Sequence, residues 1–164
     1  MHQVYLSLGS NIQPEVNLPR AIDLLQEYGE VIRVSKAWES EAVGSDGPNF
    51  LNACVLFLTT LSDAELKQQV IHPIEGRLGR KRSTDKYAPR TIDIDIVLFD
   101  DRLCNDKYWK QAFVIVPLAE IHPEYRSPFL NETIFEAATR LRQNVWMETH
   151  PAVLSRYNGI NSKS

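Results

Sequence analysis

The sequence lacks several features that would place it outside the ordinary soluble enzymes. No apolar run approaches the ~20 residues that a membrane-spanning helix needs. Met1-His2-Gln3 leads directly into a short apolar run, so we expect no signal peptide and a cytoplasmic location. Only two cysteines occur, Cys54 and Cys104, which excludes a disulfide framework, and they show no metal-ligand spacing.

The chain also has no excess of basic residues and no glycine-rich phosphate loop. Its net charge of −3 argues against nucleic-acid and anionic-membrane partners. Neither Gly-x-x-x-x-Gly-Lys-Ser/Thr nor Gly-x-Gly-x-x-Gly occurs. If the chain binds phosphate, it must therefore do so with side chains and metal ions rather than with a glycine cradle.

The elements that are present predict one α+β domain. Hydrophobic periodicity indicates strands at 4–8, 31–38, 50–60, 91–99 and 113–118, and helices at 16–28, after 62, and from 131 to about 142. Ser62-Asp63-Ala64-Glu65 is typical of a capping box, and Pro73 should kink the helix that it opens. The first six elements run β-α-β-β-α-β, which predicts a ferredoxin-like antiparallel sheet with additional C-terminal strand and helix elements. We expect the single domain to span residues 1–142 and residues 143–164 to form a poorly ordered polar tail.

Two carboxylates lie on one face of the strand predicted at 91–99. Asp93 and Asp95 are two residues apart, so their side chains point the same way from Cα atoms about 6.5–7 Å apart. Paired carboxylates on a rigid strand repel each other and attract a hard cation such as Mg²⁺. Two such ions, about 3.5–4 Å apart, would hold both ends of an in-line displacement. The alternative is that both aspartates only solvate an exposed sheet face.

A basic loop directly precedes this acidic strand. Six of the 18 Lys and Arg residues lie between Arg77 and Arg90, and Asp85 is the only acid among them. A solvated charge run is the simpler interpretation of such a loop taken alone. A cation-rich loop beside a metal-ready acidic pair is what a polyphosphate–Mg²⁺ complex needs, and the combination favours a phosphoryl-transfer site.

Three motifs carry a family resemblance. The longest is Pro89-Arg90-Thr91-Ile92-Asp93-Ile94-Asp95-Ile96, and the others are Gly9-Ser10-Asn11 and Glu75 followed by Leu78-Gly79-Arg80. With these residues, the chain resembles the 6-hydroxymethyl-7,8-dihydropterin pyrophosphokinases of folate biosynthesis, from Val4 to about Pro123. The resemblance implies a ferredoxin-like fold and Mg²⁺-dependent transfer of pyrophosphate from ATP to a pterin hydroxymethyl group, with release of AMP.

The resemblance also implies the site residues. Asp93 and Asp95 would bind two Mg²⁺ ions, and the phosphates would be contacted by Arg80, Arg82 and Arg90. The nucleotide would lie near Glu75, Lys86, Tyr87 and Ile96, with His72 one helical turn before Glu75. The pterin would be held by Ser40, Val43, Gly44, Phe50, Asn52 and Phe113. From the residues alone, an aromatic and an amide on one strand face suit a flat heterocycle, although Phe50 and Phe113 taken singly are typical core residues.

The segment Asp100–Gln111 departs from the family pattern. It is short, it contains neither the Pro-His pair nor the arginine that the family usually carries there, and Gln111 stands at the arginine position. Ala42 likewise replaces a proline. Arg102, Lys107 and Lys110 are the cations that could compensate. Two alternatives therefore stay open: a specialised enzyme for another pterin-like alcohol, and a non-catalytic ferredoxin-like binding module. We expect only small-molecule partners, ATP among them, and a monomer or weak homo-oligomer.

Overall fold

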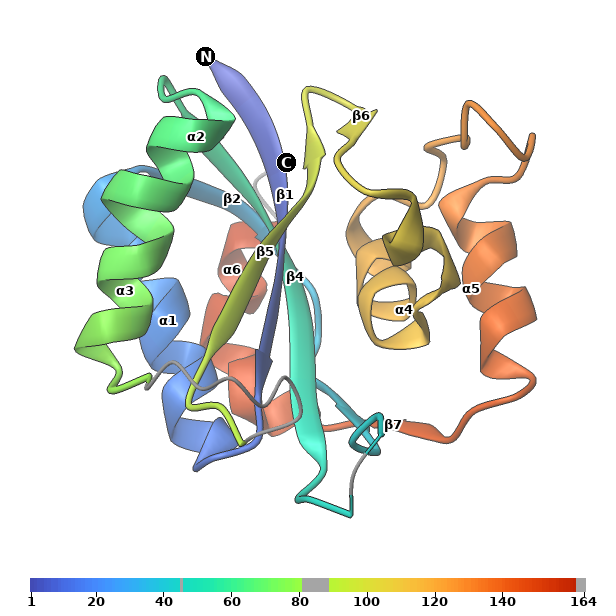
Figure 1. Cartoon of the computed structure of the whole chain (residues 1–164), viewed down its shortest axis with the longest axis horizontal. Helices are drawn as coiled ribbons and strands as arrows, with labels where there is room; N and C mark the ends of the chain where they lie inside the picture. Colours follow the sequence, from blue (N-terminus) through green and yellow to red (C-terminus); the bar gives the residue numbers. More distant parts are fainter. Residues whose placement is uncertain (45, 81–88, 162–164) are drawn as a thin grey trace.

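The computed structural model describes residues 1–44, 46–80 and 89–161 (Figure 1). In this part of the chain, seven strands form one sheet in the order β6-β5-β1-β4-β3-β7, with β2 paired to β4. All the pairings are antiparallel. The strands are β1 His2–Ser10, β2 Glu30–Val34, β3 Trp38–Ser40, β4 Phe50–Thr59, β5 Asp93–Phe99, β6 Arg102–Leu103 and β7 Met147–Thr149.

Helices cover both faces of this sheet (Figure 1). Their bounds are α1 Pro14–Tyr28, α2 Asp63–Leu66, η1 Lys67–Ile71, α3 His72–Arg77, η2 Asp106–Lys110, α4 Ala112–Ile121, α5 Ile134–Arg142, η3 Pro151–Tyr157 and α6 Asn158–Asn161. The order β1-α1-β2-β4-α2/α3-β5 and the pairing β5-β1-β4-β2 confirm the predicted ferredoxin-like arrangement. No helix among these described elements is long and apolar enough to cross a membrane.

The sheet separates two apolar cores because its strands alternate between faces. Leu6 and Leu8 of β1 point to one core, under α1, α2, α3 and η3. Tyr5 points to the other core, under α4 and α5. Ile94 and Ile96 of β5 lie in the first core, which leaves Asp93 and Asp95 on the face that carries α4 and α5. The acidic pair therefore shares a layer with α4.

The helix opened by Ser62 follows the sequence prediction at both of its special positions. Ser62 and Glu65 form the reciprocal hydrogen bonds of a capping box, at 3.2 and 3.0 Å. Pro73 follows a π-helical turn, η1, which separates α2 from α3. A proline removes one backbone donor from the helix, and the widened turn accommodates that loss. The predicted strand at 31–38 is instead divided into β2 and β3.

The prediction of a strand at 113–118 is wrong, because these residues lie within helix α4. Val114, Ile115, Val116 and Leu118 are all buried, and together they leave no polar stripe to mark a helix. An apolar run of this length is compatible with a buried strand or a buried helix. Tertiary packing decides: α4 lies between the sheet and α5, so it is apolar on nearly all sides.

The expected poorly ordered tail at 143–164 is also not what the described residues form. β7 pairs with β3 and extends the sheet. Beyond it, Leu154 and Tyr157 are buried against the core under α1, and the Tyr157 hydroxyl donates a hydrogen bond to the carbonyl oxygen of Pro19 at 2.9 Å. A few apolar anchors in a polar segment are enough to dock it on an existing core, but they produce no periodicity.

Candidate active site

The register of the sheet brings the polar residues of three strands into rows. On either side of Gly9 in β1 lie Asp93 of β5 and Asn52 of β4. Two residues earlier in β1, Ser7 lies between Asp95 and Cys54. All these positions face the α4 layer, but α4 begins only at Ala112 and leaves this end of the sheet open. A cleft of about 400 Å³ occupies the open end.

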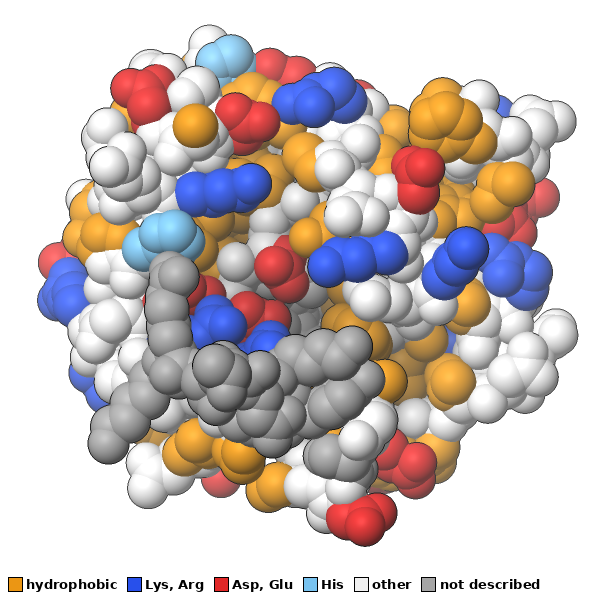
Figure 2. Space-filling model, viewed as in Figure 1, with side chains coloured by type: hydrophobic (Ala, Val, Ile, Leu, Met, Phe, Trp, Pro, Cys, Tyr) orange, Lys and Arg blue, Asp and Glu red, His pale blue; other side chains and the backbone are white. Residues whose placement is uncertain are grey.

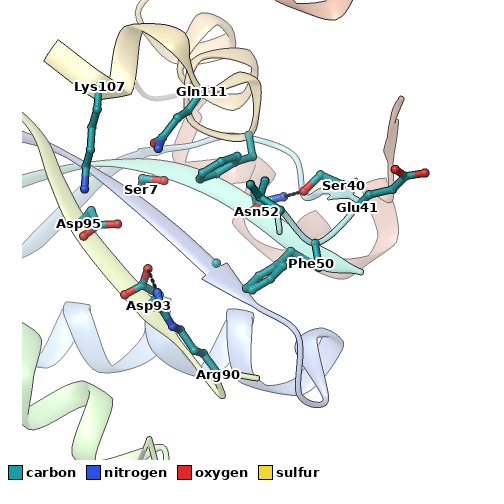
Figure 3. A pocket seen from close by; sticks show the side chains of 14 residues that line it. Ser7, Ser40, Glu41, Phe50, Asn52, Arg90, Asp93, Asp95, Lys107 and Gln111 are labelled. Carbon is teal, nitrogen blue, oxygen red and sulfur yellow. Dashed lines mark hydrogen bonds and ion pairs between the residues drawn. The ribbon is translucent and has the colours of Figure 1, made fainter. Parts of the chain in front are cut away.

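Eight of the predicted site residues line this cleft: Ser40, Val43, Phe50, Asn52, Arg90, Asp93, Asp95 and Phe113. Figure 3 shows how the labelled ones are arranged, with Asp93, Asp95 and Arg90 toward one end and Phe50, Asn52 and Ser40 toward the other. In the space-filling view, acidic and basic side chains gather in a hollow at the middle of this face (Figure 2). The cleft therefore has a charged end and an aromatic–amide end.

Gly9 forms the floor between the two ends. It has no side chain in the row between Asp93 and Asn52. A Cβ atom added at this position would lie 3.4 Å from Asn52 Oδ1 and 3.7 Å from Phe50 Cδ1. Both are ordinary van der Waals contacts, so the protein itself would accept a methyl group there. The glycine thus keeps space for something other than protein.

The amide of Asn52 is fixed in one orientation by its neighbours. Its Nδ2 donates to the carbonyl oxygen of Trp38 at 3.0 Å and to Ser40 Oγ at 2.8 Å. These two bonds use both N–H groups of the amide. Oδ1 has no hydrogen-bond donor within the described residues, and its residue lines the cleft. Asn52 is thereby set to accept a hydrogen bond from a ligand.

An ion-pair network surrounds Asp93 at the charged end. Arg80 donates to Asp93 Oδ1 at 2.8 Å and to Glu75 Oε2 at 2.5 Å, while Arg90 donates to Asp93 Oδ2 at 3.1 Å. Glu75 also accepts the backbone N–H of Ile94 at 3.0 Å, which ties α3 to the edge of β5. Burial raises the pKa of Glu75, while burial alone would lower that of Arg80. Its ion pairs with Asp93 and Glu75 outweigh this effect, so the pKa of Arg80 is raised.

Asp95 is treated differently from Asp93. It forms no hydrogen bond or ion pair within the described residues, although the amine of Lys107 is directed at it from η2 (Figure 3). Burial, followed by the negative charge of Asp93, raises the pKa of Asp95 to about 6. A half-buried, ionised carboxylate destabilises a folded protein when a second carboxylate lies beside it and no donor binds it. It is a good ligand for a hard divalent cation.

The Gly9-Ser10-Asn11 motif at the end of β1 holds the residues just before β5 in place. Asn11 Oδ1 accepts the backbone N–H of Arg90 at 2.6 Å, and the Asn11 N–H donates to the Arg90 carbonyl oxygen at 3.1 Å. This reciprocal pair fixes the backbone of Arg90 three residues before Asp93. A motif after the first strand therefore positions a cation that comes 79 residues later.

Comparison with known proteins identifies the family. The sequence model described as 7,8-dihydro-6-hydroxymethylpterin-pyrophosphokinase (HPPK) matches residues 5–123. The chain belongs to this family. It is 36% identical over 146 residues to a 2-amino-4-hydroxy-6-hydroxymethyldihydropteridine pyrophosphokinase of Synechocystis, covering 82% of this chain and 74% of the relative. It is 37% identical over 143 residues to an Aquifex aeolicus protein of the same name, covering 78% of this chain and 88% of the relative.

Solved structures show the same fold. A crystal structure of Plasmodium falciparum HPPK-DHPS with pterin and p-hydroxybenzoate superposes with a TM-score of 0.68 at 16% sequence identity. The match covers 87% of this chain but only 43% of the other, so the chain spans less than half of that protein. The same enzyme with SDX-DHP gives a TM-score of 0.66 at 16% identity, over 88% and 45% of the two chains. At this identity the likeness concerns the fold alone.

Of the other site residues predicted from the pyrophosphokinase family, five are described and do not line the cleft, and three lie outside the described residues. Arg80 is bonded to Asp93, which lines the cleft, and Glu75 is bonded to Arg80. Ile96 points its side chain into the core on the opposite face of the sheet. His72 is exposed at the start of α3, and Gly44 lies in a turn with φ +75°. The remaining three, Arg82, Lys86 and Tyr87, lie outside the described residues.

The cleft also contains residues for which no binding role had been predicted: Ser7, Gly9, Glu41, Ala42, Lys107 and Gln111. Ser7 and Gly9 follow from the same period-two rule that paired the aspartates, once β1 is known to lie beside β5. Gln111 and Lys107 could not be placed, because their positions depend on the docking of η2 and the start of α4. Lys107 had been named only as one of three cations that could compensate for missing family residues.

Proposed function

We propose that this chain transfers pyrophosphate from ATP to the hydroxymethyl group of 6-hydroxymethyl-7,8-dihydropterin and releases AMP. Its membership of the pyrophosphokinase family supports this reaction. The single observation that carries the residue assignments is the cleft itself, which joins a carboxylate pair flanked by arginines to an aromatic–amide end. Phosphates and a flat heterocycle are the two chemical classes that such ends bind.

At the aromatic–amide end, the pterin ring would lie over Gly9 between the aromatic side chains of Phe50 and Phe113. Asn52 Oδ1 would accept a hydrogen bond from a ring N–H or amino group, because its Nδ2 is already committed to Trp38 and Ser40. A site built to accept such a bond discriminates against rings that lack the donor. The space over Gly9 fits this role, since a methyl group would already fill part of it.

At the charged end, the residues fit the Mg²⁺ that accompanies ATP. Asp93 and Asp95 offer hard oxygen ligands on one strand face, and we propose that they hold two ions. When bound, the ions would neutralise phosphate charge. The guanidinium of Arg80 carries five donors, and its contacts in the described residues use a single Nη atom. Arg80 and Arg90, together with Arg82, are thus proposed to bind the phosphate oxygens.

The proposed step is a direct in-line displacement. The hydroxymethyl oxygen forms a bond to the β-phosphorus while the bond between that phosphorus and the α,β-bridging oxygen breaks. The electron pair leaves with AMP, and the hydroxyl proton passes to solvent. Holding both substrates in line and stabilising charge on the phosphate oxygens supply most of the barrier reduction. All the named residues come from one chain, and we place the enzyme in the cytoplasm as a monomer or weak homo-oligomer.

The test is pterin-dependent AMP formation. The purified protein is incubated with ATP, Mg²⁺ and 6-hydroxymethyl-7,8-dihydropterin, and AMP is separated by chromatography. We expect Asp95→Ala to lower kcat/KM by at least about a hundredfold, since it removes a preorganised charge at the reacting phosphate. Glu124→Ala, which removes an exposed carboxylate outside the cleft, should leave the rate within about twofold.

Two outcomes would contradict the proposal. Release of ADP in place of AMP would mean γ-phosphoryl transfer. Equal rates for Asp95→Ala and Glu124→Ala would remove the acidic pair from the chemistry.

A further inference from the structure

The short helix η2 lies at the rim of the cleft and is held in place by hydrogen bonds and buried side chains. It begins at Asn105, whose Oδ1 accepts the backbone N–H of Lys107 at 2.9 Å. The two side chains that follow Lys107, those of Tyr108 and Trp109, are buried. Trp109 Nε1 donates to Glu132 at 2.8 Å, and Glu132 in turn binds Arg140 of α5. The backbone of Lys107 is therefore fixed on both sides.

Of the three cations between residues 100 and 111, Lys107 alone lines the cleft. Arg102 is paired with Asp63 at 3.4 Å, far along the sheet edge. Lys110 lines a separate groove beside Trp109 and Glu132. Lys107 instead extends from η2 toward Asp95 (Figure 3), and its ammonium lies 5.4 Å from the centre of the Tyr108 ring.

The charges at this end of the cleft are arranged on two sides. Arg80 and Arg90 both bind Asp93, from the residues after α3 and from the residues before β5. Lys107 approaches the neighbouring Asp95 from η2 and forms no salt bridge within the described residues. A phosphate chain laid across the two aspartates would meet guanidinium groups on one side and an ammonium on the other.

We propose that Lys107 is a catalytic residue of the transfer, with its ammonium bound to a non-bridging oxygen of the pyrophosphoryl group that moves. This assignment rests on the proposed function and adds a group for which the family pattern gave no role. The short Asp100–Gln111 segment, which lacks the family's usual histidine and arginine, thus brings its own cation to the site by a different route.

The chemistry suits a lysine in this place. As the β-phosphorus exchanges its bond to the bridging oxygen for one to the hydroxymethyl oxygen, charge is spread over its non-bridging oxygens. A fixed cation beside those oxygens stabilises the transition state. The lysine ammonium is a compact charge with three donors, so it can face Asp95 before ATP binds and a phosphate oxygen once ATP is bound.

The experiment compares Lys107→Ala, Lys107→Arg and Lys110→Ala with the parent enzyme. We expect Lys107→Ala to lower kcat by about ten- to a hundredfold, since one preorganised charge is lost. Lys107→Arg, which keeps the charge, should recover a large part of that loss. Lys110→Ala removes the same charge from the same helix, but outside the cleft, and should stay within about twofold. Urea unfolding of all four proteins separates these effects from altered stability.

Equal kcat values for Lys107→Ala and Lys110→Ala would overturn the proposal. So would a loss in Lys107→Ala that Lys107→Arg does not relieve, because charge would then not be the cause. If the parent enzyme forms no pterin-dependent AMP, the proposed function fails by itself. Calorimetric binding of Mg·ATP to the same variants then still tests the contact between Lys107 and phosphate. Binding about tenfold weaker in Lys107→Ala, and in no other variant, would support the contact. Equal binding by all the variants would contradict it.

Discussion

At the scale of single residues, ionised Asp95 destabilises the folded protein, whereas Asp93 is stabilised by ion pairs. Asp93 is bonded to two arginines, whereas Asp95 has no such partner in the described residues. Burial and the negative charge of Asp93 raise the pKa of Asp95 from 3.8 to about 6. Between these two pH values the folded chain holds more protons than the unfolded chain. The stability of the metal-free protein therefore falls as pH rises from about 4 to about 6, and stays low above.

This cost predicts a stabilising substitution. Asp95→Asn removes the charge but keeps the shape, so the free energy of unfolding should rise by about 3 kcal/mol at pH 8. At pH 4.5 the folded carboxyl is mostly protonated and the unfolded one mostly ionised, so the gain should be only about 1 kcal/mol. Urea titrations at both pH values in the presence of EDTA measure the difference, with Glu124→Gln as the control. An equal gain at both pH values would show that the ionisation of Asp95 is not its cause.

Residues that act through spacing along one strand could be predicted from the sequence. Asp93 and Asp95 share a face because side chains alternate, and nothing else is needed. The row Asp93–Gly9–Asn52 could not be predicted in the same way, because its register belongs to three strands at once. The place of Lys107 in the cleft could not be predicted either, because the direction of its exposed side chain depends on how the buried residues of η2 pack.

At the scale of elements, Asn11 at the end of β1 holds the backbone of Arg90 and is not among the residues that line the cleft. Asn11→Ala removes the acceptor for the Arg90 backbone N–H. We expect a loss of about 1 kcal/mol in stability and a lower kcat, because Arg90 would no longer be held beside Asp93. Asn11→Asp keeps the acceptor and should retain more activity. AMP release and urea unfolding are measured together, and a variant with lowered stability but unchanged kcat would limit Asn11 to a structural role.

Some elements could be predicted from the sequence more easily than others. The helix after Ser62 could be predicted because a capping box is a local sequence motif, and both of its hydrogen bonds are present. α4 was not, because a run that is buried on nearly all sides shows neither a helical nor a strand period. The split between β2 and β3 also escaped, since it depends on how each half pairs with β4.

At the scale of the whole molecule, the cleft and the C-terminal helix η3 lie on opposite sides of the sheet. Tyr157 packs in the core under α1, and its single hydroxyl proton is shared between the Pro19 carbonyl oxygen and Asp23 Oδ1. The cleft belongs to the face of α4 and α5. Stability supplied by Tyr157 is thus separate from the geometry of the site.

This separation gives a prediction with two readouts. Tyr157→Phe keeps the ring and removes the hydroxyl, so unfolding should become easier by about 1–2 kcal/mol. The kcat for AMP release, measured well below the unfolding transition, should stay within about twofold. Tyr28→Phe, at a half-exposed position, is the control. A large fall in kcat for Tyr157→Phe would mean that the two faces of the sheet are coupled. The order of the described C-terminal residues could not be predicted, because their three buried side chains, Met147, Leu154 and Tyr157, form no periodic pattern among the polar residues.

Gly9 separates two properties that surveys of variants often treat as one. An added methyl group would meet its protein neighbours at ordinary contact distances, so the fold would tolerate alanine there. The same methyl group would stand where the ring of the substrate is proposed to lie. A screen that scores only cellular abundance would therefore record position 9 as permissive, while selection for folate synthesis would record it as intolerant. Where those two records disagree along a chain, they outline the space that a protein keeps for its ligand.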